Sequence, residues 1–103
     1  MAKSKDTVIS ERVWNGSQSV NFERLVAIGD KRVRYRIKVD AYDFQSSAIA
    51  EIWNGERWNR IHVIPGEEVL TRKMVSYVTK GVTARAFAGD LAELERVVKA
   101  VLS

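Results

Sequence analysis

Residues 32–42, RVRYRIKVDAY, alternate between polar and apolar side chains. A period of two is the period of a β-strand, in which successive side chains point to opposite faces. One face of this strand is therefore apolar, while the other carries the basic row Arg32, Arg34, Arg36 and Lys38, followed by Asp40. A strand with one apolar and one charged face predicts a sheet that is buried on one side only.

The same alternation predicts four further strands, at residues 7–14, 19–28, 46–53 and 57–64. Asn15-Gly16 and Asn54-Gly55 each separate two of these strands, and Asn-Gly favours a tight hairpin because both residues tolerate positive φ. Residues 29–31, Gly-Asp-Lys, predict the turn before the basic strand. Short connections of this kind join neighbouring antiparallel strands, so the sequence predicts a five-stranded antiparallel meander.

The second and third strands match in register. If their turn centres on residues 29–31, Phe22 and Val26 share a face with the apolar side chains of the third strand, as a half-buried sheet requires. The same register places Glu23 on the face of Arg36 and Lys38. Part of the basic row is therefore expected to be paired across strands.

Beyond Pro65 the apolar residues change to helical spacing. Pro65-Gly66-Glu67-Glu68 predicts a helix start, because acidic residues in a first turn are favoured by the helix dipole. Gly81 predicts the end of that helix, and residues 82–89 stay ambiguous. A last helix is expected from Asp90, with the aspartate as N-cap and Glu93 three residues later. Its apolar face comprises Leu91, Leu94, Val98, Val101 and Leu102.

The predicted fold class is α+β. We expect residues 1–103 to form a single domain, in which a curled five-stranded antiparallel β-meander (residues 7–64) packs against a helical C-terminal part (residues 67–102). With 46% hydrophobic residues in a chain of 103, there is enough apolar material for one core. The C-terminal helix is the element available to cover the apolar face of the sheet.

Composition excludes several classes of function. The chain has no cysteine, so disulfides and thiolate metal sites are excluded, and its one histidine, His62, lacks the partners of a metal site or a catalytic triad. No phosphate-binding loop is present. We therefore predict no enzymatic activity, no metal and no cofactor. Without a long apolar run, neither a signal peptide nor a membrane span is expected, and the cytoplasm is the predicted location.

The polar face of the sheet is the candidate binding surface. Basic side chains on one strand face lie about 6.5–7 Å apart. Arginine and tryptophan are common anchors of protein interfaces, while cations beside exposed aromatic rings also suit single-stranded nucleic acid. A face of this composition is also common where it only keeps a sheet soluble. The predicted binding residues are Arg32, Arg34, Arg36, Lys38, Trp53, Trp58, Arg60 and His62.

Residues 45–68, QSSAIAEIWNGERWNRIHVIPGEE, combine a short strand, a Trp-turn-Trp hairpin and a Pro-Gly exit. In these features the stretch resembles small uncharacterised accessory proteins of phages that infect actinobacteria, and residues 17–36 add to the likeness. The resemblance implies a phage or mobile-element accessory protein that acts by binding a host or phage protein. The resemblance carries no known activity and assigns no functional residues. A second copy of the chain and nucleic acid stay open as alternative partners.

Overall fold

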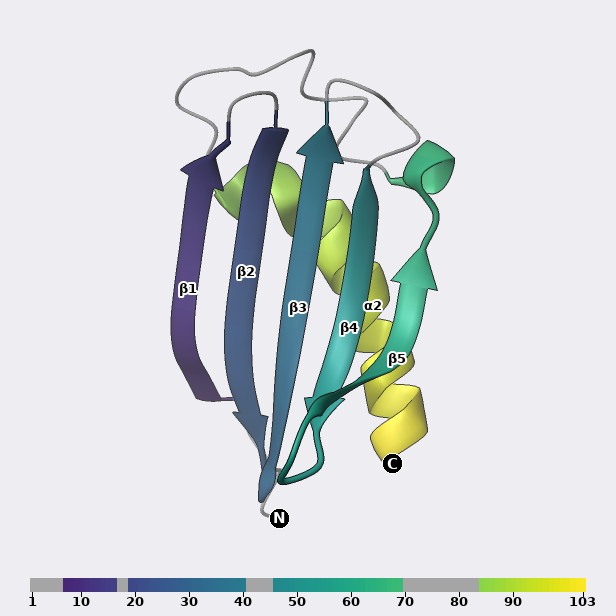
Figure 1. The fold of residues 1–103 in the computed structure, drawn as a ribbon. Helices are drawn as coiled ribbons and strands as arrows, with labels where there is room; N and C mark the ends of the chain where they lie inside the picture. Colours follow the sequence, from purple (N-terminus) through teal and green to yellow (C-terminus); the bar gives the residue numbers. More distant parts are fainter. Residues whose placement is uncertain (1–6, 17–18, 41–45, 70–83) are drawn as a thin grey trace.

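The computed structural model describes residues 7–16, 19–40, 46–69 and 84–103. Five strands form one open antiparallel sheet in chain order, with a helix on one side (Figure 1). The predicted α+β class and the five-stranded meander are confirmed. The elements are β1 (Thr7–Asn15), β2 (Ser19–Ile28), β3 (Lys31–Asp40), β4 (Ser47–Trp53), β5 (Trp58–Ile64), the 3-10 turns η2 (Gly66–Glu68) and η3 (Ala84–Phe87), and the helix α2 (Ala88–Leu102).

The register between β2 and β3 is the predicted one. Phe22 lies opposite Ile37, and Glu23 lies opposite Arg36. The even residues of β2 and the odd residues of β3 therefore share the apolar face, which we call the inner face. Its buried side chains on these two strands are Val20, Phe22, Val26, Val33, Tyr35, Ile37 and Val39.

Helix α2 covers the inner face. It runs diagonally behind the sheet and contacts β3, β4 and β5 (Figure 1). Its buried apolar side chains, Leu91, Leu94 and Val98, join the core. Just before the helix, Phe87 stacks on Phe22 of β2, with ring centroids 5.2 Å apart and the planes inclined by 21°. The core is therefore a single layer between the inner face and the C-terminal segment.

Strand β1 lies at the edge of the sheet and is exposed along most of its length. Its link to the helix passes through Arg24 of β2. The Arg24 Nε donates a hydrogen bond of 2.7 Å to Oε1 of Glu11 on β1, and its Nη1 lies 3.6 Å from Oε2 of Glu95 on α2. This one cation therefore connects three elements on the helix side of the sheet.

The predicted faces of β5 are wrong beyond Arg60. Alternation predicted His62 and Ile64 on the polar face. In the structure Arg60 pairs with Glu51 but His62 pairs with Ala50, so Ile61 is an additional residue that forms a β-bulge. An insertion of one residue reverses the faces of all later residues in a strand. His62 therefore lies on the helix side of the sheet, opposite Ala50, and so does Ile64, which is buried.

The predicted helix start at Pro65 is wrong. Residues Gly66–Glu68 form one 3-10 turn, after which Val69 is extended, with φ −68° and ψ 114°. The remainder of that predicted helix, residues 70–81, lies outside the described residues, as do residues 41 and 42 of the predicted third strand.

The predicted cap at Asp90 is also wrong. Because the 3-10 turn η3 continues directly into α2, the helix begins at Ala88 with Phe87 as N-cap, and no side chain caps it. Asp90 is buried within the first turn. Glu93, expected to complete a capping box, instead accepts hydrogen bonds from Arg96.

Candidate recognition surface

The sheet face opposite α2 is free of helix cover in the described structure, and we call it the outer face. The strand registers bring seven of the eight predicted binding residues onto it. The eighth, His62, is excluded from it by the bulge. The outer face includes Arg12 and Trp14 of β1, Asn21, Glu23 and Leu25 of β2, Arg32, Arg34, Arg36, Lys38 and Asp40 of β3, Ser47, Ile49, Glu51 and Trp53 of β4, and Trp58, Arg60 and Val63 of β5.

The β4–β5 hairpin positions two tryptophans. Trp53 and Trp58 are direct cross-strand partners, with ring centroids 5.4 Å apart and planes inclined by 58°. The turn between them is closed by Asn54, whose Oδ1 accepts hydrogen bonds from the backbone N–H groups of Glu56 and Arg57. Gly55 supplies the required positive φ of 100°. The local sequence therefore holds a tilted aromatic pair on the outer face, and Trp53 is 39% exposed.

Arg34 is held between an aromatic ring and a carboxylate. Its guanidinium carbon lies 4.4 Å from the centre of the Trp58 ring, within the range of a cation–π contact. Its Nε and Nη2 lie 2.9 and 2.8 Å from Oε1 of Glu51, the residue directly opposite it on β4. Both contacts restrict the same guanidinium, so Arg34 is ordered before any partner arrives.

The basic row is partly paired across strands, as expected, but with a different carboxylate. Oε1 of Glu51 also lies 3.6 Å from Nη1 of Arg36, so this one carboxylate pairs with two cations of the row. Glu23, although it lies opposite Arg36, forms its ion pair with Arg12 of β1 at 3.5 Å. Glu51 lies directly opposite Arg34 and within 3.6 Å of Arg36, whereas Glu23 pairs with Arg12, its cross-strand partner on β1.

The outer face keeps an excess of positive charge. Six cations, Arg12, Arg32, Arg34, Arg36, Lys38 and Arg60, stand against three carboxylates, Glu23, Asp40 and Glu51. Lys38 is 3.6 Å from Asp40. Arg32 and Arg60 form no ion pair with any residue in the described part of the chain. The uncompensated charge is therefore concentrated near the β4–β5 hairpin.

Two shallow hollows mark the outer face. The first, which we call the hairpin hollow, has a volume of about 310 Å³ and is lined by Leu25, Arg32, Trp53 and Trp58. The second, the Trp14 hollow, has a volume of about 180 Å³ and lies across β1 to β4. Its outer-face lining comprises Arg12, Trp14, Asn21, Glu23, Arg36, Lys38, Ser47 and Ile49. Each hollow thus combines tryptophan with cations of the basic row.

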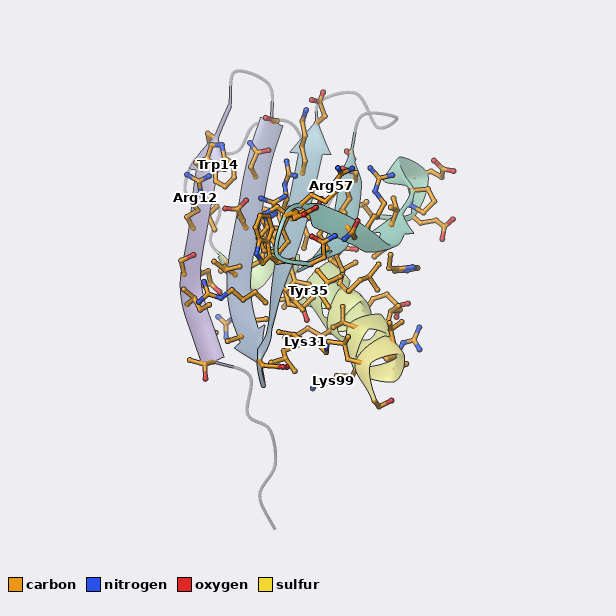
Figure 2. The ribbon with its side chains drawn as sticks, turned by 60° about the horizontal axis from the view of Figure 1, so that its bottom comes forward. Arg12, Trp14, Lys31, Tyr35, Arg57 and Lys99 are labelled. Atoms are coloured by element: carbon orange, nitrogen blue, oxygen red, sulfur yellow. The ribbon has the colours of Figure 1, made fainter. Side chains whose placement is uncertain are left out.

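Trp14 is a member of this surface that sequence reasoning missed. Its indole is 39% exposed, and the guanidinium of Arg12 lies 4.3 Å from its ring centre. Figure 2 shows the two side chains next to each other on β1. Trp14 pairs with Asn21, which pairs in turn with Lys38. Extending the predicted register through the Asn15-Gly16 turn to β1 would have found it.

A larger hollow lies on the other side of the molecule, between β5, η2 and α2. It measures about 640 Å³, and His62, Pro65, Glu68 and Glu93 are among the residues that line it. Among its lining residues Arg96 donates a 2.7 Å hydrogen bond to Glu93, which lowers the pKa of that carboxyl. His62 therefore belongs to this second surface and is separated from the tryptophans by the sheet.

The described residues contain no cluster of histidine, cysteine, aspartate or glutamate suited to a metal ion. In the same part of the chain, no helix has the length and apolar character needed to cross a membrane. Comparisons of the chain with protein-family models, with curated proteins and with solved structures found no match in any of the three. These comparisons neither support nor contradict the resemblance to phage accessory proteins, so function is inferred from the outer face itself.

Proposed function

We propose that this protein is a non-enzymatic binding protein, a phage or mobile-element accessory protein that engages a host or phage protein through its outer face. The observation that carries the proposal is the set of contacts around Arg34, which is fixed by Trp58 and Glu51 beside the exposed Trp53. Arginine and tryptophan dominate the binding energy of many protein interfaces. Side chains that are ordered before binding lose less conformational freedom on association, which favours affinity.

Exposed aromatic surface supports the same proposal. Trp14 and Trp53 are each 39% exposed and lie on a face that no helix of the described chain covers. Large apolar side chains gathered on one exposed face are typical of an interaction surface, whereas scattered ones are ordinary. Because the two indoles belong to the two hollows of one face, burial by a single partner would remove both from water.

Single-stranded nucleic acid is the second candidate partner. Stacking of bases on Trp14, Trp53 and Trp58, with cations between them, would suit a single strand. The carboxylates argue against nucleic acid. Glu51 already pairs with Arg34 and Arg36 of the basic row, and binding of phosphates requires cations that are not neutralised by carboxylates. A salt-sensitive gel shift of a labelled single strand, lost on Trp53→Ala, would favour nucleic acid over protein.

A capture experiment tests the proposal. Immobilised protein is incubated with nuclease-treated actinobacterial lysate, and retained proteins are identified and then tested again in purified form. We expect one purified component to bind the wild type and the Lys99→Gln variant, whose substitution lies on α2 (Figure 2), and not the Trp53→Ala/Trp58→Ala variant. The two tryptophans are surface anchors, so their loss should weaken binding by about 30-fold or more. Equal binding by all three proteins would refute a role for the outer face.

A further inference from the structure

Each of the two hollows of the outer face is lined by apolar side chains and by cations of the basic row. We propose that the partner segment they recognise is an extended acidic peptide with two apolar side chains four residues apart, one for each hollow. This inference rests on the proposed function, because it names the class of partner for the same face. Beyond the proposed function, it specifies the charge, the spacing of apolar side chains and the extended conformation of the partner segment.

The hairpin hollow requires an apolar side chain next to a negative charge. Its walls are Leu25, Trp53 and Trp58, which offer apolar surface. Its remaining lining residue is Arg32, which has no carboxylate partner among the residues that the structure describes. A carboxylate from the partner would form an ion pair with Arg32, and hydrogen bonds between a guanidinium and a carboxylate are among the stronger ones in proteins. The charge of the hollow therefore favours an acidic peptide over a basic one.

The Trp14 hollow repeats this chemistry. Trp14 and Ile49 provide apolar walls. The charged lining comprises the cations Arg12, Arg36 and Lys38 and one carboxylate, Glu23, which forms an ion pair with Arg12, so positive charge is in excess. Arg36 and Lys38 have only long contacts of 3.6 Å with a carboxylate, and their side chains are about half exposed. They can therefore exchange these partners for a carboxylate of the bound peptide at little cost, since exposed ion pairs contribute less than about 1 kcal/mol.

The distance between the hollows sets the spacing of the anchors. Both hollows include cations of β3, Arg32 in one and Arg36 in the other, and these two residues are about 13 Å apart along a strand. In an extended peptide, residues i and i+4 point to the same side and are also about 13 Å apart. In an α-helix the same two residues would be separated by only about 6 Å along the axis. An extended segment is therefore the form that reaches both hollows.

Tryptophan fluorescence of the full chain tests this proposal. The probes are two synthetic acidic peptides of identical composition without aromatic residues, which carry two leucines either at i and i+4 or at i and i+2. Because only the wider spacing fills both hollows, we expect the i,i+4 peptide to bind at least about tenfold more tightly. Arg32→Gln should weaken that binding about tenfold, whereas Lys99→Gln, which removes one charge from α2, should leave it unchanged.

Equal affinity for the two peptides, or binding that is insensitive to Arg32→Gln, would overturn the two-anchor proposal. Circular dichroism of each variant confirms that a loss of binding is not a loss of fold. The capture experiment separates this result from the proposed function. If a purified partner still requires Trp53 and Trp58 while neither peptide binds, the outer face recognises a different structure, and only the further inference fails.

Discussion

Replacing Phe87 by alanine is expected to destabilise the protein by about 3–5 kcal/mol. The Phe87 side chain is fully buried and stacks on Phe22, so it joins the C-terminal segment to β2 at the point where α2 begins. Truncation would leave a cavity between β2 and the helix start. Since domains of this size have a total stability of about 5–15 kcal/mol, the loss would be a large part of it.

Urea denaturation followed by circular dichroism measures this effect. Val101→Ala is the control, because Val101 lies on the same C-terminal segment but is 59% exposed, and its truncation should change the free energy of unfolding by less than about 0.5 kcal/mol. A loss below about 1 kcal/mol for Phe87→Ala would mean that the C-terminal segment does not pack on β2 as described.

Arg34→Glu is expected to weaken binding of the protein partner by on the order of 100-fold. The substitution removes the guanidinium from the Trp58 ring and places a second carboxylate opposite Glu51. Because Glu51 is largely buried, this repulsion should also lower the free energy of unfolding by about 1–3 kcal/mol. Calorimetric titration with the captured partner and urea denaturation measure the two effects separately.

The exchanged variant Arg34→Glu/Glu51→Arg separates the ion pair from recognition. It restores opposite charges on the two strands, so most of the lost stability should return. Binding should stay weakened, because position 34 of β3 then carries a carboxylate in place of the anchoring guanidinium. An unchanged affinity in Arg34→Glu would show that Arg34 is not an anchor. A swap that fails to recover stability would show that the cross-strand pair contributes little.

Much of the sheet could be predicted from sequence because its determinants are local. The alternation in residues 32–42 and the Asn54-Gly55 turn, in which Gly55 has the expected positive φ, indicate a strand and a hairpin without reference to the rest of the chain. At the other Asn-Gly pair the tight turn is wrong, because Asn15 still belongs to β1 and pairs with Val20. The match of apolar faces predicts that even residues of β2 lie opposite odd residues of β3, as they do in the structure. Of the seven outer-face residues predicted for the site, Arg32, Arg34, Arg36 and Lys38 lie on β3, whereas Trp53, Trp58 and Arg60 are brought to the same face by the pairing of β3 with β4 and of β4 with β5.

The misassignments arise where tertiary packing overrides a local pattern. In β5 the bulge at Ile61 turns His62 and Ile64 toward the helix side, which brings Ile64 into the core but breaks the period of two. At the start of α2, the burial of Phe87 against Phe22 fixes where the helix begins, so the capping signal at Asp90 is not used. Neither the bulge nor the helix start can be predicted from the sequence of neighbouring residues alone.

The indole N–H signals of the three tryptophans give the most direct test of the outer face as the binding surface. On addition of the purified partner to nitrogen-15-labelled protein, we expect the signals of Trp14, Trp53 and Trp58 to shift together. Amide signals of exposed α2 residues such as Lys99 should keep their positions. Shifts confined to α2 or to the surroundings of His62, with all three indoles unchanged, would contradict recognition by the outer face.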